Sequence, residues 1–315
     1  MISLVIPVYE PEEMLKHLLD HLERLRARLP IPLEVVFVVD GRTENYLYLK
    51  SRSKSFSYRH QILLLSRNFG SWPAINAGLE AGRGEYFAIM SADMQEPPEL
   101  IERFVEVLVD GSADIAIGQR ERRSDPPFSR LCSNLYWGFY RRLVNADVPR
   151  GGADVFAVTA EVRDLLISLR EANTSLVALL FWVGFRRKLV GYSRQARIAG
   201  KSNWSFAKKV RHALNGAINF SDIPIQALLY VGVLGLVCSL LGIATVIVAK
   251  VLGVVNLPGY AATVCAIGFF GGLSSFGLGI LGQYLWLVLQ NVRGRPNYVV
   301  MIREDGTPAV EGGGA

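Results

Sequence analysis

The sequence predicts an α/β domain with a mostly parallel sheet, joined to a hairpin of two membrane-spanning helices. Two observations support this prediction: strand-like and helix-like segments alternate over residues 2–91, and a later block is almost free of charge. Residues 1–222, which precede that block, are enough for one sizeable domain with a buried core. Of the 315 residues, 50% are hydrophobic and 20% are charged, which excludes wholesale disorder.

The alternating segments are defined by apolar spacing. Strand-like runs cover Ile2–Val8, Leu33–Val39, Gln61–Leu65 and Tyr86–Ser91, and helical spacing covers Glu12–Leu29 and Trp72–Ala81. This order is typical of a parallel sheet, in which ligands bind beyond the carboxyl ends of the strands. We therefore expect a site in the segments that follow the strands, at residues 7–10, 40–42, 66–70 and 91–95.

The apolar block accounts for the high mean hydropathy of +0.26. From Ile223 to Val292 the only charged side chain is that of Lys250. The block resolves into two spans, Pro224–Val248 and Ala261–Val288, each longer than the roughly 20 residues needed to cross a bilayer. A buried helical hairpin of a soluble protein is the alternative, but a chain of this size has little with which to cover it.

Charge predicts the orientation of these spans. The turn between them, at residues 253–260, carries no charge, whereas Arg293 and Arg295 follow the second span. The positive-inside rule then places both termini and the preceding domain in the cytoplasm of a multi-pass protein of the cell (inner) membrane. Glycines along the second span permit close helix approach, which favours a homo-oligomer.

A basic segment precedes the first span. Nine Lys or Arg residues and no acid lie between Ala172 and Ser221. Residues 204–222 combine aromatic, aliphatic and basic side chains at helical spacing, as in a helix lying on an anionic membrane surface; a solvated basic face is the alternative. No nucleic-acid module accompanies the charge, so we expect no nucleic-acid partner. The predicted organisation is a domain at 1–203, an interfacial helix at 204–222, two spans at 223–292 and a cytoplasmic tail at 293–315.

Six segments in order resemble the family-2 glycosyltransferases of the GT-A fold, a Rossmann-like fold. The closest subgroup is the polyprenyl-phosphate glycosyltransferases, which include dolichol-phosphate mannose synthase and bacterial glucosyl-transfer enzymes. The matching segments are Ser3–Tyr9, Leu65–Gly70, Ala92–Glu99, the Arg-x-x-Gly-x-Ser-x-aromatic pattern at 197–204, Phe220–Pro224, and Gly282–Leu285 followed by Arg293–Tyr298.

The resemblance implies a nucleotide-sugar site. Asp93 and the amide of Gln95 would hold a divalent cation, Mg²⁺ or Mn²⁺, because phosphate-bridging ions take hard oxygen ligands. Asp40 matches the acid that binds the nucleobase or ribose. The remaining residues assigned to the donor side are Pro7, Tyr9, Arg67, Asn68, Gly70 and Ser91.

The acceptor implied is a lipid phosphate, whose second pKa of about 6 leaves its oxygen nucleophilic at pH 7 without a general base. Such an acceptor requires positively charged side chains that hold its phosphate in line with the donor. Matching positions are Arg120, Arg130 with Ser133, and Arg197 with Ser202 on the membrane side. Asp154 matches an acid that binds a sugar hydroxyl or orients the reacting groups; an acid capping the next helix is the equal alternative.

Three departures concern the donor side. Ser91 stands where the family's metal loop usually begins with Asp. With one carboxylate fewer, the metal is expected to be bound more weakly, hydrated differently or lost. Arg42 follows Asp40-Gly41 in place of Ser, and Glu10-Pro11 replaces Asn-Glu. These two changes leave the identity of the nucleobase open.

The function expected is that of an inverting glycosyltransferase that moves one hexose from UDP or GDP to undecaprenyl or dolichyl phosphate, for modification of cell-envelope glycans. A processive polysaccharide synthase is less favoured, because its Gln-x-x-Arg-Trp motif and further spans are missing from the sequence. A non-catalytic binding or scaffold protein on the same fold is the alternative from a different class.

Overall fold

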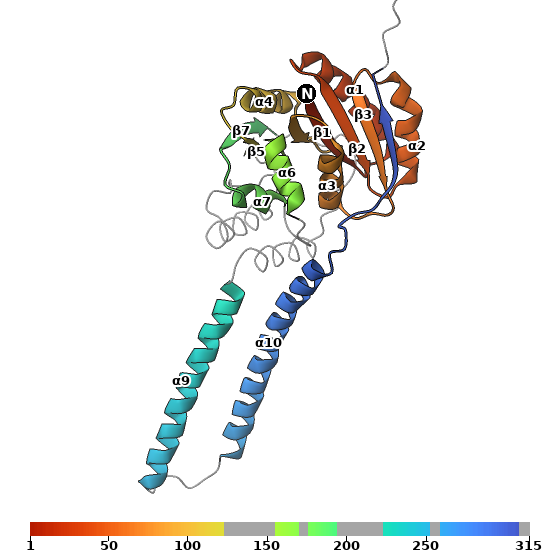
Figure 1. Cartoon of the computed structure of the whole chain (residues 1–315). Coiled ribbons are helices and arrows are strands. Elements are labelled where there is room, and N and C mark those ends of the chain that lie inside the picture. Colours follow the sequence, from red (N-terminus) through yellow and green to blue (C-terminus); the bar gives the residue numbers. More distant parts are fainter. Residues whose placement is uncertain (123–154, 170–175, 194–222, 253–258, 309–315) are drawn as a thin grey trace, which may run out of the picture. The chain divides into compact units, whose positions relative to one another are not determined.

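The structure, a computed structural model, describes residues 1–122, 155–169, 176–193, 223–252 and 259–308 (Figure 1). The chain divides into two compact units. The first consists of Met1–Lys209 together with Pro296–Ala315, and the second of Val210–Arg295. The first unit therefore contains both ends of the sequence.

An eight-stranded sheet forms the centre of the first unit, in the described part of the chain. Its strands are β1 (Ile2–Val8), β2 (Leu33–Val39), β3 (Arg59–Leu65), β4 (Tyr86–Ile89), β5 (Ile115–Arg122), β6 (Phe156–Thr159), β7 (Arg187–Ser193) and β8 (Val300–Gly306), in the order β7-β5-β6-β4-β1-β2-β3-β8. The four strands β1 to β4 run parallel, as do β5 and β7, whereas β6 and β8 are antiparallel to their neighbours. The prediction of an α/β fold with a mostly parallel sheet is confirmed.

The predicted boundaries agree closely with the observed ones. β1 and β2 have the predicted limits, β3 begins two residues earlier, and β4 ends two residues before Ser91. Continuous apolar runs mark β1 and β2 because helices cover both faces of the sheet, so successive side chains are buried alternately on each side.

Two helical layers provide this cover (Figure 1). Helices α1 (Glu12–Arg28), α2 (Thr43–Arg52) and α4 (Pro98–Val109) pack on the face where Leu4 and Phe37 point, and η1 (Ser53–Ser55) follows α2. Helices α3 (Ser71–Ala81) and α6 (Ala160–Ser168) lie on the other face, with α7 (Leu176–Trp182) beside α6. Gly78 allows α3 to sit close to the sheet, because a Cβ there would lie 2.2 Å from Val5 Cγ1.

The last strand was not predicted. Residues 293–315 read as a tail, but β8 within them extends the sheet by pairing antiparallel with β3, from His60 opposite Gly306 to Leu65 opposite Val300. Side chains fasten it to the domain: Arg303 donates a 2.9 Å hydrogen bond to Gln61, and Glu304 accepts a 2.7 Å hydrogen bond from the Tyr46 hydroxyl. The C-terminal segment is thus part of the sheet.

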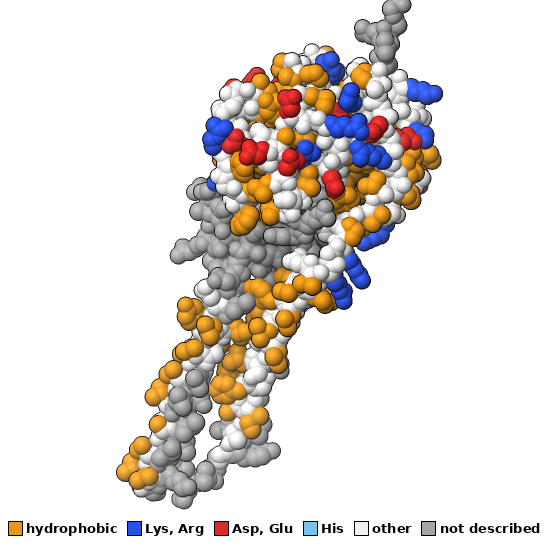
Figure 2. Space-filling model, in the orientation of Figure 1, with side chains coloured by type: hydrophobic (Ala, Val, Ile, Leu, Met, Phe, Trp, Pro, Cys, Tyr) orange, Lys and Arg blue, Asp and Glu red, His pale blue; other side chains and the backbone are white. Residues whose placement is uncertain are grey.

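The second unit contains two long helices, α9 (Ile223–Val251) and α10 (Tyr260–Val292). They pack antiparallel, since Cβ atoms on Gly235 and Gly277 would lie 3.3 Å from Phe270 and 3.2 Å from Leu228. Among the described residues, large apolar side chains are exposed along both helices (Figure 2). In the described ranges, one helical stretch, Phe269–Val292, is long and apolar enough to cross a membrane. The predicted interfacial helix at 204–222 lies outside the described residues.

Candidate functional site

Four loops meet at one edge of the sheet. Because β1 to β4 are parallel, with Val8 opposite Val39 and Val39 opposite Leu64, their carboxyl ends lie side by side. The loops after these strands carry the residues that the sequence assigned to the donor side, except Pro7, which lies within β1 one residue before its end. That these residues form a donor site stays a prediction.

Asp40, directly after β2, links two of these loops. Its side chain is buried, and its two carboxylate oxygens accept hydrogen bonds from the backbone N–H groups of Phe69, at 2.7 Å, and Gly70, at 2.8 Å. Burial raises the pKa of Asp40, and the two N–H groups and Arg67 oppose that rise. Asp40 therefore holds the 66–70 loop; a contact between Asp40 and a nucleobase stays a prediction.

Gly41 allows the same two loops to approach closely. It has a φ of +78°, and a Cβ at this position would lie 2.4 Å from the backbone nitrogen of Asn68. Both features require glycine, since a side chain favours neither this φ nor this contact. Gly70 also lies in the left-handed region, with a φ of +99°, at the start of α3.

Two arginines stack on aromatic rings around these loops. The Arg42 guanidinium carbon lies 4.3 Å from the centre of the Tyr9 ring, and that of Arg67 lies 4.1 Å from the centre of the Phe69 ring. Arg67 also donates a 3.2 Å hydrogen bond to the backbone oxygen of Asn68. Stacking of this kind orients a guanidinium while its N–H groups stay available to an anionic ligand. The edge therefore carries positive charge where a diphosphate would bind.

The loop after β4 holds the predicted metal ligands. Asp93 and Gln95 are both buried, and the Gln95 backbone N–H donates a 3.3 Å hydrogen bond to Asp93 Oδ1. Between them Met94 has a φ of 51°, rare for a residue with a side chain, and that side chain is packed into the core. A carboxylate and an amide oxygen fit a hard cation such as Mg²⁺ or Mn²⁺ that takes its other ligands from phosphates and water. Among the residues described, no group of three His, Cys, Asp or Glu side chains is placed to bind a metal.

Glu96 lies in the same loop, and no role was predicted for it. It is 1% exposed, and its Oε2 accepts a hydrogen bond from the backbone N–H of Ser91 at 3.3 Å. The signal available in the sequence was an acid directly after the Asp93-x-Gln95 pair and before two prolines.

On the acceptor side the structure places one predicted residue. Arg120 lies near the carboxyl end of β5, opposite Tyr192 of β7, and its Nε donates a long hydrogen bond of 3.4 Å to the Tyr192 hydroxyl. β5 runs in the same direction as β4, since β6 between them is antiparallel to both, so Arg120 belongs to the same edge as Asp93. The other predicted residues lie outside the described ranges: Arg130, Ser133, Asp154, Arg197 and Ser202.

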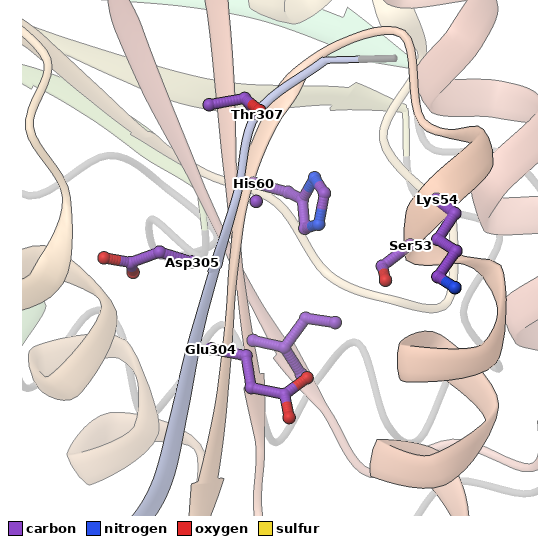
Figure 3. Close-up of a pocket in the computed structure, with 8 residues that line it drawn as sticks. Ser53, Lys54, His60, Glu304, Asp305 and Thr307 are labelled. Atoms are coloured by element: carbon purple, nitrogen blue, oxygen red, sulfur yellow. The ribbon is translucent and has the colours of Figure 1, made fainter.

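A small pocket lies at the opposite edge of the sheet (Figure 3). Its volume is about 170 Å³, and His60, at the start of β3, lines it together with Lys54, Glu304 and Asp305. Burial lowers the pKa of His60. Ligand pockets are typically about 300–1,000 Å³. The pocket is therefore too small for a sugar nucleotide.

Comparison with known proteins agrees with this geometry. Residues 3–156 match the model of glycosyl transferase family 2. An uncharacterized glycosyltransferase of Synechocystis sp. is 30% identical over 95% of this chain and 94% of its own length. The SfII prophage-derived bactoprenol glucosyl transferase of Shigella flexneri is 29% identical over 98% of this chain and 99% of its own.

Among solved structures, glucosyl-3-phosphoglycerate synthase from Mycobacterium tuberculosis superposes with a TM-score of 0.51 at 16% identity, covering 70% of this chain and 79% of that one. This likeness shows the GT-A-like fold of the first unit. The sequence match over nearly the whole chain shows more: the protein belongs to glycosyl transferase family 2.

Proposed function

We propose that this chain is an inverting glycosyltransferase that moves one sugar from a nucleotide-sugar donor to a polyprenyl phosphate at the cytoplasmic face of a cell membrane. The observation that carries the proposal is that Asp40, the 66–70 loop, Asp93 and Arg120 all lie along the same edge of the sheet. Similarity over 98% of the chain to a protein named a bactoprenol glucosyl transferase supports the acceptor class.

The donor half of the reaction uses the first four loops. Arg67, Asn68 and Gly70 would face the diphosphate, on a loop that Asp40 holds through two hydrogen bonds. Asp93 and Gln95 would hold the divalent cation. When bound, this cation neutralises charge on the departing diphosphate. Tyr9, which is 38% exposed beside Arg42, offers a ring to the nucleoside at the end of β1.

The acceptor half needs no general base. An oxygen of the lipid phosphate attacks the anomeric carbon of the sugar while the bond from that carbon to the diphosphate oxygen breaks. The bonding electrons leave with the nucleoside diphosphate, and the product is a β-linked polyprenyl-phosphate sugar. Since the phosphate is already ionised, the acceptor side needs only to hold it in line, the role proposed for Arg120. Arg130, Ser133, Arg197 and Ser202 are proposed as its further contacts, and Asp154 as a ligand of a sugar hydroxyl.

The position of β8 supports two membrane crossings. Residues before α9 and after α10 contribute strands to one sheet, so they lie on the same side of any membrane that the helices cross. A chain that leaves and returns to one side crosses an even number of times. Phe269–Val292 qualifies as a span, and α9 has 29 residues with Lys250 as its one charged side chain. The proposal is therefore a hairpin of α9 and α10 with both termini cytoplasmic.

The test is sugar transfer by the purified full-length protein. UDP- and GDP-sugars labelled in the sugar are offered with undecaprenyl phosphate, in Mg²⁺, Mn²⁺ or chelator. We expect transfer from one donor that stops with chelator and is lost in Asp93→Asn. Asp164→Asn, which removes an exposed acid on α6, is the matched control and should retain transfer.

The same assay distinguishes an enzyme from a binding protein that has no catalytic activity. Ser91 departs from the family pattern within the metal loop, which favours a second candidate, a binding protein without catalysis. Folded protein that binds a nucleoside diphosphate but transfers no sugar from any donor would overturn the enzymatic proposal and favour that candidate.

A further inference from the structure

We propose that Glu96 supplies the negative charge that the metal loop lacks at residue 91. The inference rests on the proposed function, since it concerns the cation that Asp93 and Gln95 would hold. It extends the set of metal-side residues by one that the sequence pattern does not assign.

The geometry of the loop carries this inference. The Glu96 side chain folds back along the loop, and its Oε2 lies 3.3 Å from the backbone nitrogen of Ser91. The same loop is closed by a 3.4 Å hydrogen bond from Met94 N–H to the Ser91 backbone oxygen. The carboxylate of residue 96 thus lies beside residue 91, where an aspartate side chain would begin.

The Glu96 carboxylate is deeply buried, which matters because an ionised group is costly to bury. Glu96 is 1% exposed, and Asp93 and Gln95 beside it are 6% and 9% exposed. A carboxylate so little exposed is costly unless hydrogen bonds or a cation compensate its charge. Glu99, in the first turn of α4, is more than half exposed and therefore serves as a control for the effect of burial.

Met94 indicates that the loop is held in this shape. A residue with a side chain in the left-handed region costs about 1–2 kcal/mol and persists only where its surroundings fix it. The Met94 side chain is packed in the core, so the main chain on each side of it is fixed. Glu96 and Ser91 therefore lie on either side of a main chain that the core holds in place.

The test moves the charge from one residue to the other. Glu96→Gln keeps a hydrogen-bond acceptor of the same size but removes the charge; Ser91→Asp combined with Glu96→Gln restores a carboxylate at residue 91. Free Mn²⁺ is measured by electron paramagnetic resonance in the presence of UDP or GDP, with the melting temperature as a check on folding. Glu99→Gln is the matched control.

We expect Glu96→Gln to weaken Mn²⁺ binding about tenfold or more, the double variant to recover most of the loss, and Glu99→Gln to match the native protein. Equal binding by Glu96→Gln and the native protein would overturn the inference while leaving the proposed function intact. If the double variant does not recover the Mn²⁺ binding that Glu96→Gln loses, the inference is also overturned. A carboxylate at residue 91 would then not replace the one at residue 96. If the native protein binds no Mn²⁺ with either nucleotide, the metal-dependent function fails first and the inference falls with it.

Discussion

Asp40→Ala provides a direct test of how the donor loop is held. The substitution removes two hydrogen bonds to a carboxylate, each worth about 1.5–3 kcal/mol. Phe69 and Gly70 are half-buried, so water partly replaces the lost acceptor and the lower value applies, about 3 kcal/mol in total. Relief of the buried charge, whose desolvation raises the pKa of Asp40, offsets part of this loss. The net loss expected is therefore less than about 3 kcal/mol.

The assay is thermal unfolding of the full-length protein in detergent, followed by circular dichroism. For a domain of this size, a loss of up to about 3 kcal/mol lowers the melting temperature by up to about 12 °C. Asp110→Ala is the control: that exposed carboxylate also accepts a backbone hydrogen bond, from Ser112 at 2.8 Å, but solvent surrounds it, so a smaller fall is expected. An Asp40→Ala protein that melts with the native one would refute the view that Asp40 ties the two loops together.

Two further substitutions test the packing and the titration of the first unit. Gly41→Ala adds a Cβ 2.4 Å from Asn68 N, so we expect lower stability and weaker nucleotide binding in calorimetry. Gly111→Ala, at a φ of +70° but in open space, should show only the backbone strain of about 1–2 kcal/mol. The pKa of His60 is lowered by burial, partly opposed by Asp305, so the unfolded chain takes up its proton first as pH falls. Stability should therefore fall below about pH 6.5, and His60→Gln should reduce that fall in melting curves between pH 7.5 and 5.5; an unchanged pH profile would contradict this assignment.

The parallel half of the sheet was predictable because its pattern is local. β1 and β2 are buried on both faces and therefore read as unbroken apolar runs in the sequence. β8 escaped prediction because it is an edge strand: four of its seven residues are exposed, and three of the seven are charged. Its place is fixed by partners such as Gln61, far away in the sequence, and no local pattern reveals a partner of that kind.

The same distinction applies to the site. That Asp40, Arg67 and Asp93 lie at one edge follows from strand order, which the sequence indicates. That Asp40 accepts hydrogen bonds from Phe69 and Gly70 depends on how two loops fold together, whereas the family resemblance suggested a contact with the nucleobase or ribose. The role of Glu96 depends likewise on a side chain that folds back by five residues.

β8, the last strand in the sequence, is synthesised long after β3, the strand with which it pairs. Gln61 and Arg303 are 242 residues apart, so the edge of β3 stays without its neighbour while that length of chain is synthesised, about 12–50 s at 5–20 residues per second. During that time both apolar helices leave the ribosome before the domain is complete. A protein that terminates before Val300 keeps its helices but has the apolar strand β3 at the edge of its sheet. In the complete chain the edge strand is β8, and its three charged residues oppose pairing with other chains.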